Sequence, residues 1–154
     1  MHTEIGLDMA APPERILELC GDIAAWPRLL PHYRAVRLQG RRDGRLLAQM
    51  VAVRPLGPLG IPVTWRAEQW AEAADPGDLR LRFRHIRGVT RGMDVTWHIR
   101  PTATGSRVTI EHDFRRSLPL LGDRFLPALV DRFFTRPIAR RTLARFKRLA
   151  EAGR

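Results

Sequence analysis

Apolar residues recur at three- and four-residue spacing through the last third of the chain, from about residue 118 to residue 152. This spacing predicts a long amphipathic helix with one side facing a core. The first half of the apolar stripe contains Phe125, Leu126, Leu129, Val130, Phe133 and Phe134, and the second half contains Ala139, Leu143, Phe146 and Ala150. Opposite the first half lie Arg124, Asp131 and Arg132. The two halves differ in helical phase, and Pro137 separates them. We therefore predict a bend or interruption within Thr135–Ile138, because proline lacks a backbone donor and restricts the preceding residue.

Upstream of this helix, apolar and polar residues alternate, which is typical of half-buried β-strands. The first strand is predicted at residues 4–9, and two short helices follow it, one opening at Ala11-Pro12-Pro13-Glu14 and one running from Asp22 to Leu30. Further strands are predicted at 33–40, 45–54, 62–72, 79–87, 92–100 and 106–115. Turn residues separate these strands, and no helical pattern intervenes. This regular spacing favours an antiparallel meander over parallel βαβ units.

Each predicted strand from the middle of the chain onward has one apolar face and one charged face. The apolar face must be covered, and the C-terminal helix is the only large element available to cover it. We therefore predict an α+β fold in a single domain, residues 1–154, with a seven-stranded antiparallel sheet wrapped around that helix. The segment 55–62 is too rich in proline and glycine to be predicted as a strand. Two interpretations of it stay open, a mobile lip over a cavity and an ordinary covered connection.

Three polar residues, Gln69, His85 and His112, fall on the apolar face of the predicted sheet. A buried polar group without a partner costs roughly 1–3 kcal/mol, so each must bond to protein, to water or to a ligand in a cavity. No histidines, cysteines or carboxylates have metal-ligand spacing, so no metal site is predicted. Phosphate-binding loops, dinucleotide fingerprints and nucleophile elbows are also absent from the sequence, and no cofactor is predicted.

The net charge of +11 comes almost entirely from arginine, since Lys147 is the sole lysine. Residues 115–154 hold ten arginines and one lysine against three acidic residues. A plain solvated helix face is the favoured interpretation, with weak contact to an anionic membrane as the alternative. Nucleic acid is not favoured, because no nucleic-acid fold signature or interleaved aromatic residues accompany the charge. The single cysteine, Cys20, is predicted to be a small buried hydrophobe, and with no signal-peptide pattern we expect a cytoplasmic protein.

Several stretches resemble a known family. Ala-Pro-Pro-Glu-Arg at 11–15, Asp-Ile-Ala-Ala-Trp-Pro at 22–27 and Leu-Pro-His-Tyr at 30–33 are similar to the opening of the polyketide cyclase/dehydrase and lipid-transport family. That family belongs to the START-like, Bet v 1-like helix-grip superfamily. The resemblance continues to the closing stretch 138–146, so it covers essentially the whole chain. It implies a hydrophobic cavity between the sheet and the long helix.

The resemblance also implies two kinds of function. Members include aromatase/cyclases that fold a poly-β-ketone tethered to an acyl carrier protein, and carriers of quinones or lipids that catalyse no reaction. In the cyclases a tyrosine follows the Trp-Pro segment, and a serine and an arginine project inward from a middle strand. Tyr33 matches the tyrosine, whereas Ala67 and Gln69 occupy the other two positions in an ungapped comparison around Trp65. A polyketide, lipid or quinone is thus the implied ligand, with an acyl carrier protein as a candidate partner.

For cyclase chemistry we predict Tyr33 and Gln69 as donors to carbonyl oxygens and His85 as the acid/base, because imidazole titrates near neutrality. These three side chains should converge on one volume. The residues predicted to bind the ligand are Trp65, Ala67, Phe83, Trp97, His112, Phe125, Leu129 and Phe133. We expect a pocket of roughly 300–1,000 Å³, reached near residues 55–62. A carrier would need the same pocket without a tuned acid/base.

Overall fold

The computed structural model describes residues 1–115 and 127–152. Its strands are β1 (His2–Met9), β2 (Tyr33–Arg42), β3 (Arg45–Leu56), β4 (Leu59–Asp75), β5 (Asp78–Gly88), β6 (Met93–Thr102) and β7 (Gly105–Phe114). The helices after β1 are α1 (Pro13–Gly21), the 3₁₀ turn η1 (Ile23–Ala25) and α2 (Trp26–Leu29). Residues 127–130 are helical and lead into the π-helical turn η2 (Asp131–Thr135) and then α4 (Arg136–Ala152).

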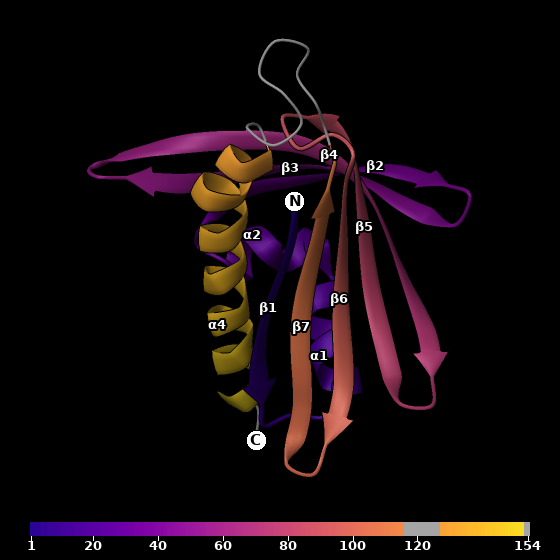
Figure 1. The fold of residues 1–154 in the computed structure, drawn as a ribbon. Coiled ribbons are helices and arrows are strands. Elements are labelled where there is room, and N and C mark those ends of the chain that lie inside the picture. The colour runs from indigo at the N-terminus through magenta and orange to yellow at the C-terminus, as the bar shows by residue number, and fades with distance from the viewer. Residues whose placement is uncertain (116–126, 153–154) are drawn as a thin grey trace.

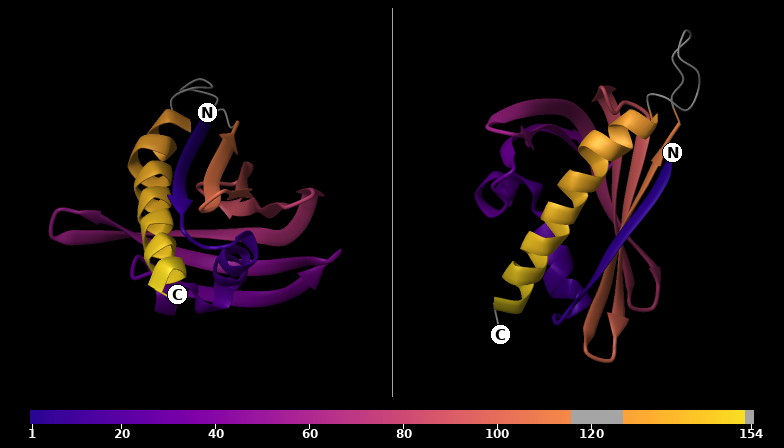
Figure 2. Two further views of the ribbon diagram at one scale, coloured as in Figure 1. Left: turned by 90° about the horizontal axis from the view of Figure 1, so that it is seen from below. Right: turned by 60° about the vertical axis from the view of Figure 1, so that its left-hand side comes forward.

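The seven strands form one antiparallel sheet in the order β1-β7-β6-β5-β4-β3-β2. The sheet curves, and α4 runs along its concave side with α1 and α2 (Figures 1 and 2). Strand residues that alternate with the charged outer positions point at these helices and are buried, as Val95, Trp97 and Ile99 of β6 are. The architecture confirms the predicted α+β fold, in which the sheet wraps around the C-terminal helix. No helix in the described part of the chain is long and apolar enough to cross a membrane.

The prediction of an irregular connection at residues 55–62 is wrong. Strands β3 and β4 pair through this segment as far as Leu56 and Leu59, which lie opposite each other. Proline is tolerated in β3 here because the pairing of β3 with β2 ends at Ala52, so Pro55 lies on a free edge where no donor is required. The segment is also not covered, since Leu59 is 70% exposed.

The C-terminal helix departs from α geometry at η2, immediately before Pro137. The backbone N–H of Arg136 bonds to the carbonyl of Asp131, five residues back. A single wide turn of this kind inserts an extra residue and shifts the phase of the helix that follows. The predicted interruption is confirmed in kind but begins earlier, at Asp131, and the chain stays helical through Pro137 (Figure 2).

Trp26 connects the short helices, the sheet and α4. Its ring lies 4.9 Å from Tyr33, 5.8 Å from Phe83, 6.1 Å from Trp97 and 5.9 Å from Phe146, measured between ring centroids. The indole N–H donates to the carbonyl of Cys20 at 3.1 Å, so the polar atom of this buried ring is satisfied. Cys20 itself is fully buried, and burial raises its pKa to about 12, which agrees with the predicted inert thiol.

Candidate functional site

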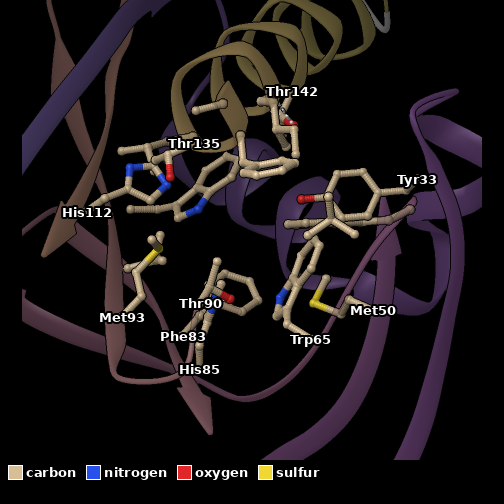
Figure 3. Close-up of a pocket in the computed structure, with 18 residues that line it drawn as sticks. Tyr33, Met50, Trp65, Phe83, His85, Thr90, Met93, His112, Thr135 and Thr142 are labelled. Atoms are coloured by element: carbon tan, nitrogen blue, oxygen red, sulfur yellow. Dashed lines mark hydrogen bonds between the residues drawn. The ribbon is translucent and has the colours of Figure 1, made fainter. Parts of the chain in front are cut away.

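An internal pocket of about 80 Å³ lies between the concave face of the sheet and the η2–α4 helix (Figure 3). Its apolar walls include Trp26, Met50, Trp65, Phe83, Met93 and Trp97. Its polar side chains are Tyr33, His85, Thr90, His112, Thr135 and Thr142. Tyr33 and Trp65 lie on one side of the pocket, and His112 lies on the other beside Thr135 (Figure 3). The site is therefore an apolar chamber with a few polar groups, the usual composition of a small-molecule pocket.

The pocket is smaller than predicted from the sequence. Aromatic rings occupy much of the space within the grip. The imidazole of His85 stacks on Trp65 with centroids 5.5 Å apart, and Tyr33 meets the same indole edge-on at 6.0 Å. A volume of about 80 Å³ holds a few waters or a small part of a ligand. A molecule of two or more rings therefore requires the aromatic walls to move apart.

The structure brings together only part of the predicted site. Among the predicted residues, those lining the pocket are Tyr33, Trp65, Phe83, His85, Trp97 and His112. Gln69 does not converge with Tyr33 and His85, because its amide donates to the carbonyl of Gly21 at 2.8 Å. That carbonyl ends α1, where intrahelical donors run out, so Gln69 satisfies a helix terminus. Ala67 is buried opposite His85 and does not line the pocket.

The ligand-facing side of the C-terminal helix was predicted with the wrong phase. Leu129 and Phe133 are 40% and 36% exposed and do not line the pocket, whereas Phe134 does. Phe125 lies outside the described residues. The wide turn of η2 explains the error, because a wheel of uniform α geometry does not apply across it. The same turn buries Asp131, which the wheel had placed on the polar side.

The predicted entrance near residues 55–62 is also wrong, since no residue of that segment lines the internal pocket. The segment instead forms one wall of a separate surface groove of about 580 Å³. The opposite wall of this groove is α4, which contributes Arg141, Arg145 and Arg148.

Burial holds both pocket histidines in the neutral form at pH 7. It lowers the pKa of His85 to about 3, and nearby His112 adds to this effect. The same cause lowers the pKa of His112 to about 4, although the carboxylates of Asp131 and Asp113 oppose it. His85 therefore does not titrate near neutrality as predicted. Its Nδ1 is hydrogen-bonded to the Thr90 hydroxyl at 2.7 Å, which fixes the ring against Trp65.

A polar corner surrounds His112, and two of its members were not predicted from the sequence. Thr3 of β1 lies directly opposite His112 of β7 in the sheet register, so both side chains point to the same face. Asp131 of η2 is buried nearby, and one of its oxygens accepts from Arg136 Nε at 2.7 Å. Thr3 Oγ1, His112 Nδ1 and the other Asp131 oxygen are buried without a hydrogen-bond partner in the described structure. These three atoms lie near one another because of the strand register and the π-turn. No sequence motif therefore predicts this group.

On the opposite side of the pocket, Tyr33 and Trp65 supply donors. Burial raises the pKa of the Tyr33 hydroxyl, against the opposing effect of the neighbouring Thr142 hydroxyl, so Tyr33 stays protonated. The Nε1–H of Trp65 is buried and has no acceptor among the described residues. A buried donor without an acceptor costs free energy, which a ligand carrying an acceptor would recover.

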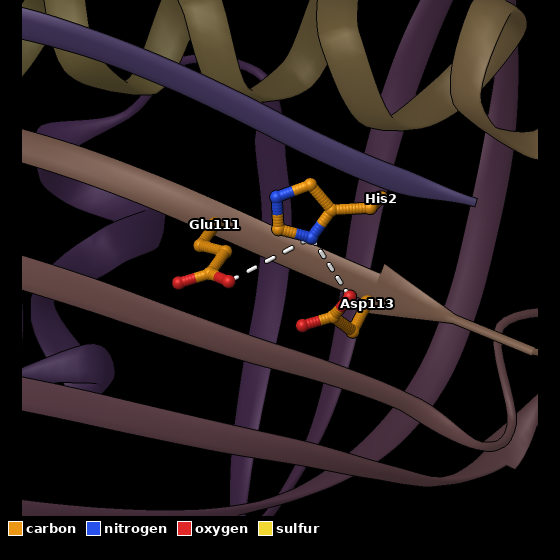
Figure 4. Close-up of side chains that lie close together, drawn as sticks. All are labelled: His2, Glu111 and Asp113. Atoms are coloured by element: carbon orange, nitrogen blue, oxygen red, sulfur yellow. Dashed lines mark hydrogen bonds and ion pairs between the residues drawn. The ribbon is translucent and has the colours of Figure 1, made fainter.

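One group of described side chains has the composition of a metal site, and it lies on the outer face of the sheet (Figure 4). His2 Nδ1 is 2.8 Å from Asp113 Oδ1 and 3.6 Å from Glu111 Oε1. The hydrogen bond to Asp113 is the main cause that raises the pKa of His2. Desolvation opposes it, and the charges of Asp113, Glu111 and Glu4 add to the rise. The raised pKa favours protonated His2, and a proton competes with a metal ion for the ring nitrogen. The group is therefore best described as an exposed ion pair.

The family model for polyketide cyclase / dehydrase and lipid transport matches residues 3–151 of the chain. The chain belongs to this family. A curated relative is the "Putative polyketide cyclase" of Streptomyces cyaneus, which is 25% identical over 114 residues, covering 73% of this chain and 72% of the relative.

Several solved structures superimpose on nearly the whole chain. A protein of Thermus thermophilus matches with a TM-score of 0.76 and 24% identity, covering 99% of both chains. The Zhui aromatase/cyclase of Streptomyces sp. R1128 matches with a TM-score of 0.76 and 17% identity over 98% of this chain and 93% of its own. A STAR-related lipid transfer protein fragment of Xanthomonas axonopodis has a TM-score of 0.64 at 14% identity over 96% of this chain and 85% of its own. At these identities the structures establish the fold, and it is shared by cyclases and lipid transfer proteins.

Proposed function

We propose that this protein binds a small apolar molecule carrying a carbonyl or similar hydrogen-bond acceptor in the internal pocket. The observation that carries the proposal is that Trp65 Nε1–H lines an apolar pocket and has no acceptor among the described residues. Aromatic walls favour a planar ligand, because rings pack edge-to-face or stacked against one another. Neutral His85 and His112 and protonated Tyr33 add uncharged hydrogen-bonding groups, which suit an uncharged ligand.

The proposal is tested by a double-mutant-type cycle. One step removes the donor, the Trp65 N–H, and the other removes the acceptor, the carbonyl oxygen of the ligand. Trp65→Phe keeps an aromatic ring and removes the N–H. The ligands are acetophenone and α-methylstyrene, which have a single ring and similar shapes but differ in the carbonyl oxygen. A hydrogen bond to a buried N–H is worth about 0.5–1.5 kcal/mol, so Trp65→Phe should weaken ketone binding roughly 3- to 10-fold and leave hydrocarbon binding nearly unchanged. Binding is measured by calorimetry.

Trp70→Phe is the matched control. Trp70 lies on the outer face of the sheet, where the guanidinium of Arg45 sits 3.9 Å above its ring. This variant should bind both ligands as the parent does. If the ketone and the hydrocarbon bind Trp65→Phe with the same ratio of affinities as the parent, the proposed hydrogen bond does not exist. If neither ligand binds the parent, an apolar ligand for this pocket is the wrong function.

A second candidate, aromatase/cyclase chemistry, is favoured by the position of Asp131 near His112. Cyclisation of a poly-β-ketone requires proton removal beside a carbonyl, stabilisation of the developing oxyanion, and loss of water. A buried carboxylate next to a neutral imidazole stabilises the imidazolium that forms when the imidazole takes a proton. Asp131 raises the pKa of His112 in this way, while His85 has no such partner. His112 is thus the stronger candidate base, and Tyr33 is the candidate donor to the oxyanion.

Cyclase activity is tested by presenting a poly-β-ketone thioester and following the dehydrated aromatic product. His112→Gln keeps hydrogen-bonding capacity but loses basicity, so turnover should fall about 100-fold or more while binding is retained. His85→Gln should have a much smaller effect, because His85 lacks a neighbouring carboxylate. Equal turnover in His112→Gln and the parent would remove His112 from the chemistry. If the parent yields no aromatic product, carrier function is the better account.

A further inference from the structure

Exposed apolar side chains concentrate on one part of the surface. Among the described residues, the large hydrophobic side chains at least 36% exposed are Leu38, Leu56, Leu59, Ile61, Val89, Leu129 and Phe133. Three of these belong to the end of the β3–β4 hairpin, and two belong to the helical segment that leads into α4. Arg54 of the hairpin lies 4.9 Å from the ring centroid of Phe133, so the two groups adjoin. We call residues 54–61 and residues 129–148 the hairpin–helix surface.

The hairpin–helix surface carries arginines that have no carboxylate partner within the described ranges. Arg141, Arg145 and Arg148 line the groove beside the hairpin, and Arg54 and Arg132 flank Phe133. Arg54 and Arg132 lie over the ring of Phe133, and Arg145 Nε donates to the carbonyl of Leu29. Burial, and after it the charge of Arg141, lowers the pKa of His32. On the outer face of the sheet, several arginines are paired: Arg45 with Glu68, Arg82 with Glu72 and Arg100 with Asp78. Unpaired arginines also lie elsewhere, such as Arg41 and Arg42 at the end of β2, but there Leu38 is the one large exposed hydrophobic residue of the described β2. The hairpin–helix surface is therefore distinguished by unpaired arginines together with clustered exposed apolar side chains.

Acidic residues are almost missing from the same surface. The hairpin end from residue 54 to residue 61 contains none. The helical part contains only Asp131, which is 8% exposed and bound to Arg136. Unpaired cations around exposed apolar side chains match an anionic phospholipid membrane, where apolar groups enter the interface and cations meet lipid phosphates.

We propose that the hairpin–helix surface docks this protein on anionic phospholipid membranes, with Leu56, Leu59 and Ile61 inserted at the interface. The shape of the surface favours a membrane over a folded protein partner. The β3–β4 hairpin projects past α4 in both views, so its tip can enter a soft interface without a complementary pocket opposite it (Figures 1 and 2). The most exposed of the three side chains, Leu59 at 70%, lies next to this tip.

Docking here would place the internal pocket close to the lipid. Phe134, Thr135 and Ile138 line the pocket, while Phe133 and Arg132 belong to the adjacent membrane-facing turn. An apolar ligand could then pass between the membrane and the pocket without crossing water. Membrane docking itself does not depend on the proposed ligand, because it rests on the charge and exposure of the surface alone.

Vesicle sedimentation tests this inference with the full chain. The vesicles contain either phosphatidylcholine alone or phosphatidylcholine with about one third phosphatidylglycerol. We expect binding to the anionic vesicles at low salt, weakened about 10-fold or more at high salt, and little binding to the neutral ones. Leu59→Ser should weaken binding to anionic vesicles about 5-fold, and the double variant Arg141→Glu/Arg148→Glu about 10-fold or more.

The other hairpin supplies matched controls. Leu38→Ser removes an exposed leucine of β2, and Arg41→Glu/Arg42→Glu reverses two exposed charges at the β2–β3 turn. Both should bind vesicles within about twofold of the parent, because they lie outside the hairpin–helix surface. Circular dichroism confirms that each variant is folded. The proposal is overturned if the parent protein does not bind anionic vesicles. This outcome would include a surface that binds an acidic protein instead of lipid. Equal losses in test and control variants overturn it as well.

Discussion

Replacing Trp26 with alanine is expected to lower the free energy of unfolding by about 3–5 kcal/mol. The ring is 2% exposed and contacts aromatic side chains of β2, β5, β6 and α4. Its removal leaves a cavity at the point where the short helices, the sheet and α4 meet, and it orphans the Cys20 carbonyl that the indole N–H satisfies. Urea unfolding followed by circular dichroism measures the change.

Trp70→Ala is the control for the loss of a tryptophan. Trp70 is partly exposed on the outer face of the sheet and packs against the guanidinium groups of Arg45 and Arg82. Its loss should cost about 1 kcal/mol or less, because cation–π contacts at exposed sites are weak. A cost for Trp26→Ala as small as that for Trp70→Ala would show that Trp26 does not hold the layers together.

The second large effect expected is a loss of stability on acidification. The pKa of each pocket imidazole falls from 6.5 to about 3 for His85 and about 4 for His112 on folding. Between these values and 6.5 the unfolded chain binds more protons than the folded chain, so stability falls as the pH falls. The stability associated with burying each neutral imidazole is fully present above pH 6.5, and it is lost as the pH falls toward the folded-state pKa. From pH 7 to pH 5 each histidine should cost about 2 kcal/mol, measured by urea unfolding at each pH.

Variants separate this effect from general acid sensitivity. His112→Gln should remove about one third of the stability loss between pH 7 and pH 5. Buried His32, whose pKa burial lowers to about 4, takes up a proton on unfolding as His85 and His112 do, so the variant removes one of three such groups. His2→Gln is the control, since His2 is exposed on the outer face and its pKa is raised. A stability profile that is flat between pH 7 and pH 5, or equally steep in His112→Gln and the parent, would contradict neutral burial of these rings.

The sheet was predictable from the sequence because side-chain alternation and turn residues are local signals. The one error in predicting the strands is at residues 55–62. Proline was taken to exclude a strand there, whereas a free strand edge tolerates proline. Which strands pair at that edge is a tertiary property. The inward side chains of the middle strands, Trp65, Phe83, His85 and Trp97, were placed correctly because strand parity carries no phase uncertainty once the pairing is antiparallel.

The helical side of the site was less predictable. A helical wheel assumes a uniform turn, and η2 breaks that assumption at the point where the helix meets the pocket. Leu129 and Phe133 were therefore assigned to the pocket in place of Phe134, and the burial of Asp131 was missed. Gln69 faced inward as predicted, but the partner that it bonds depends on where α1 ends in space. The low pKa of His85 likewise depends on burial, which a residue type does not encode.

The central claim is that the internal pocket binds an apolar ligand through Trp65 and His112. The most direct measurement is a titration of isotope-labelled protein with acetophenone, followed through the N–H signals of its tryptophan and histidine rings. Trp65→Phe and His112→Gln identify the two signals, and Trp70 is the internal reference. We expect the Trp65 and His112 signals to shift together and to saturate at one ligand per chain, while the Trp70 signal stays in place. Saturable binding that shifts Trp70 and leaves Trp65 and His112 unchanged would contradict the claim, and so would the absence of any shift.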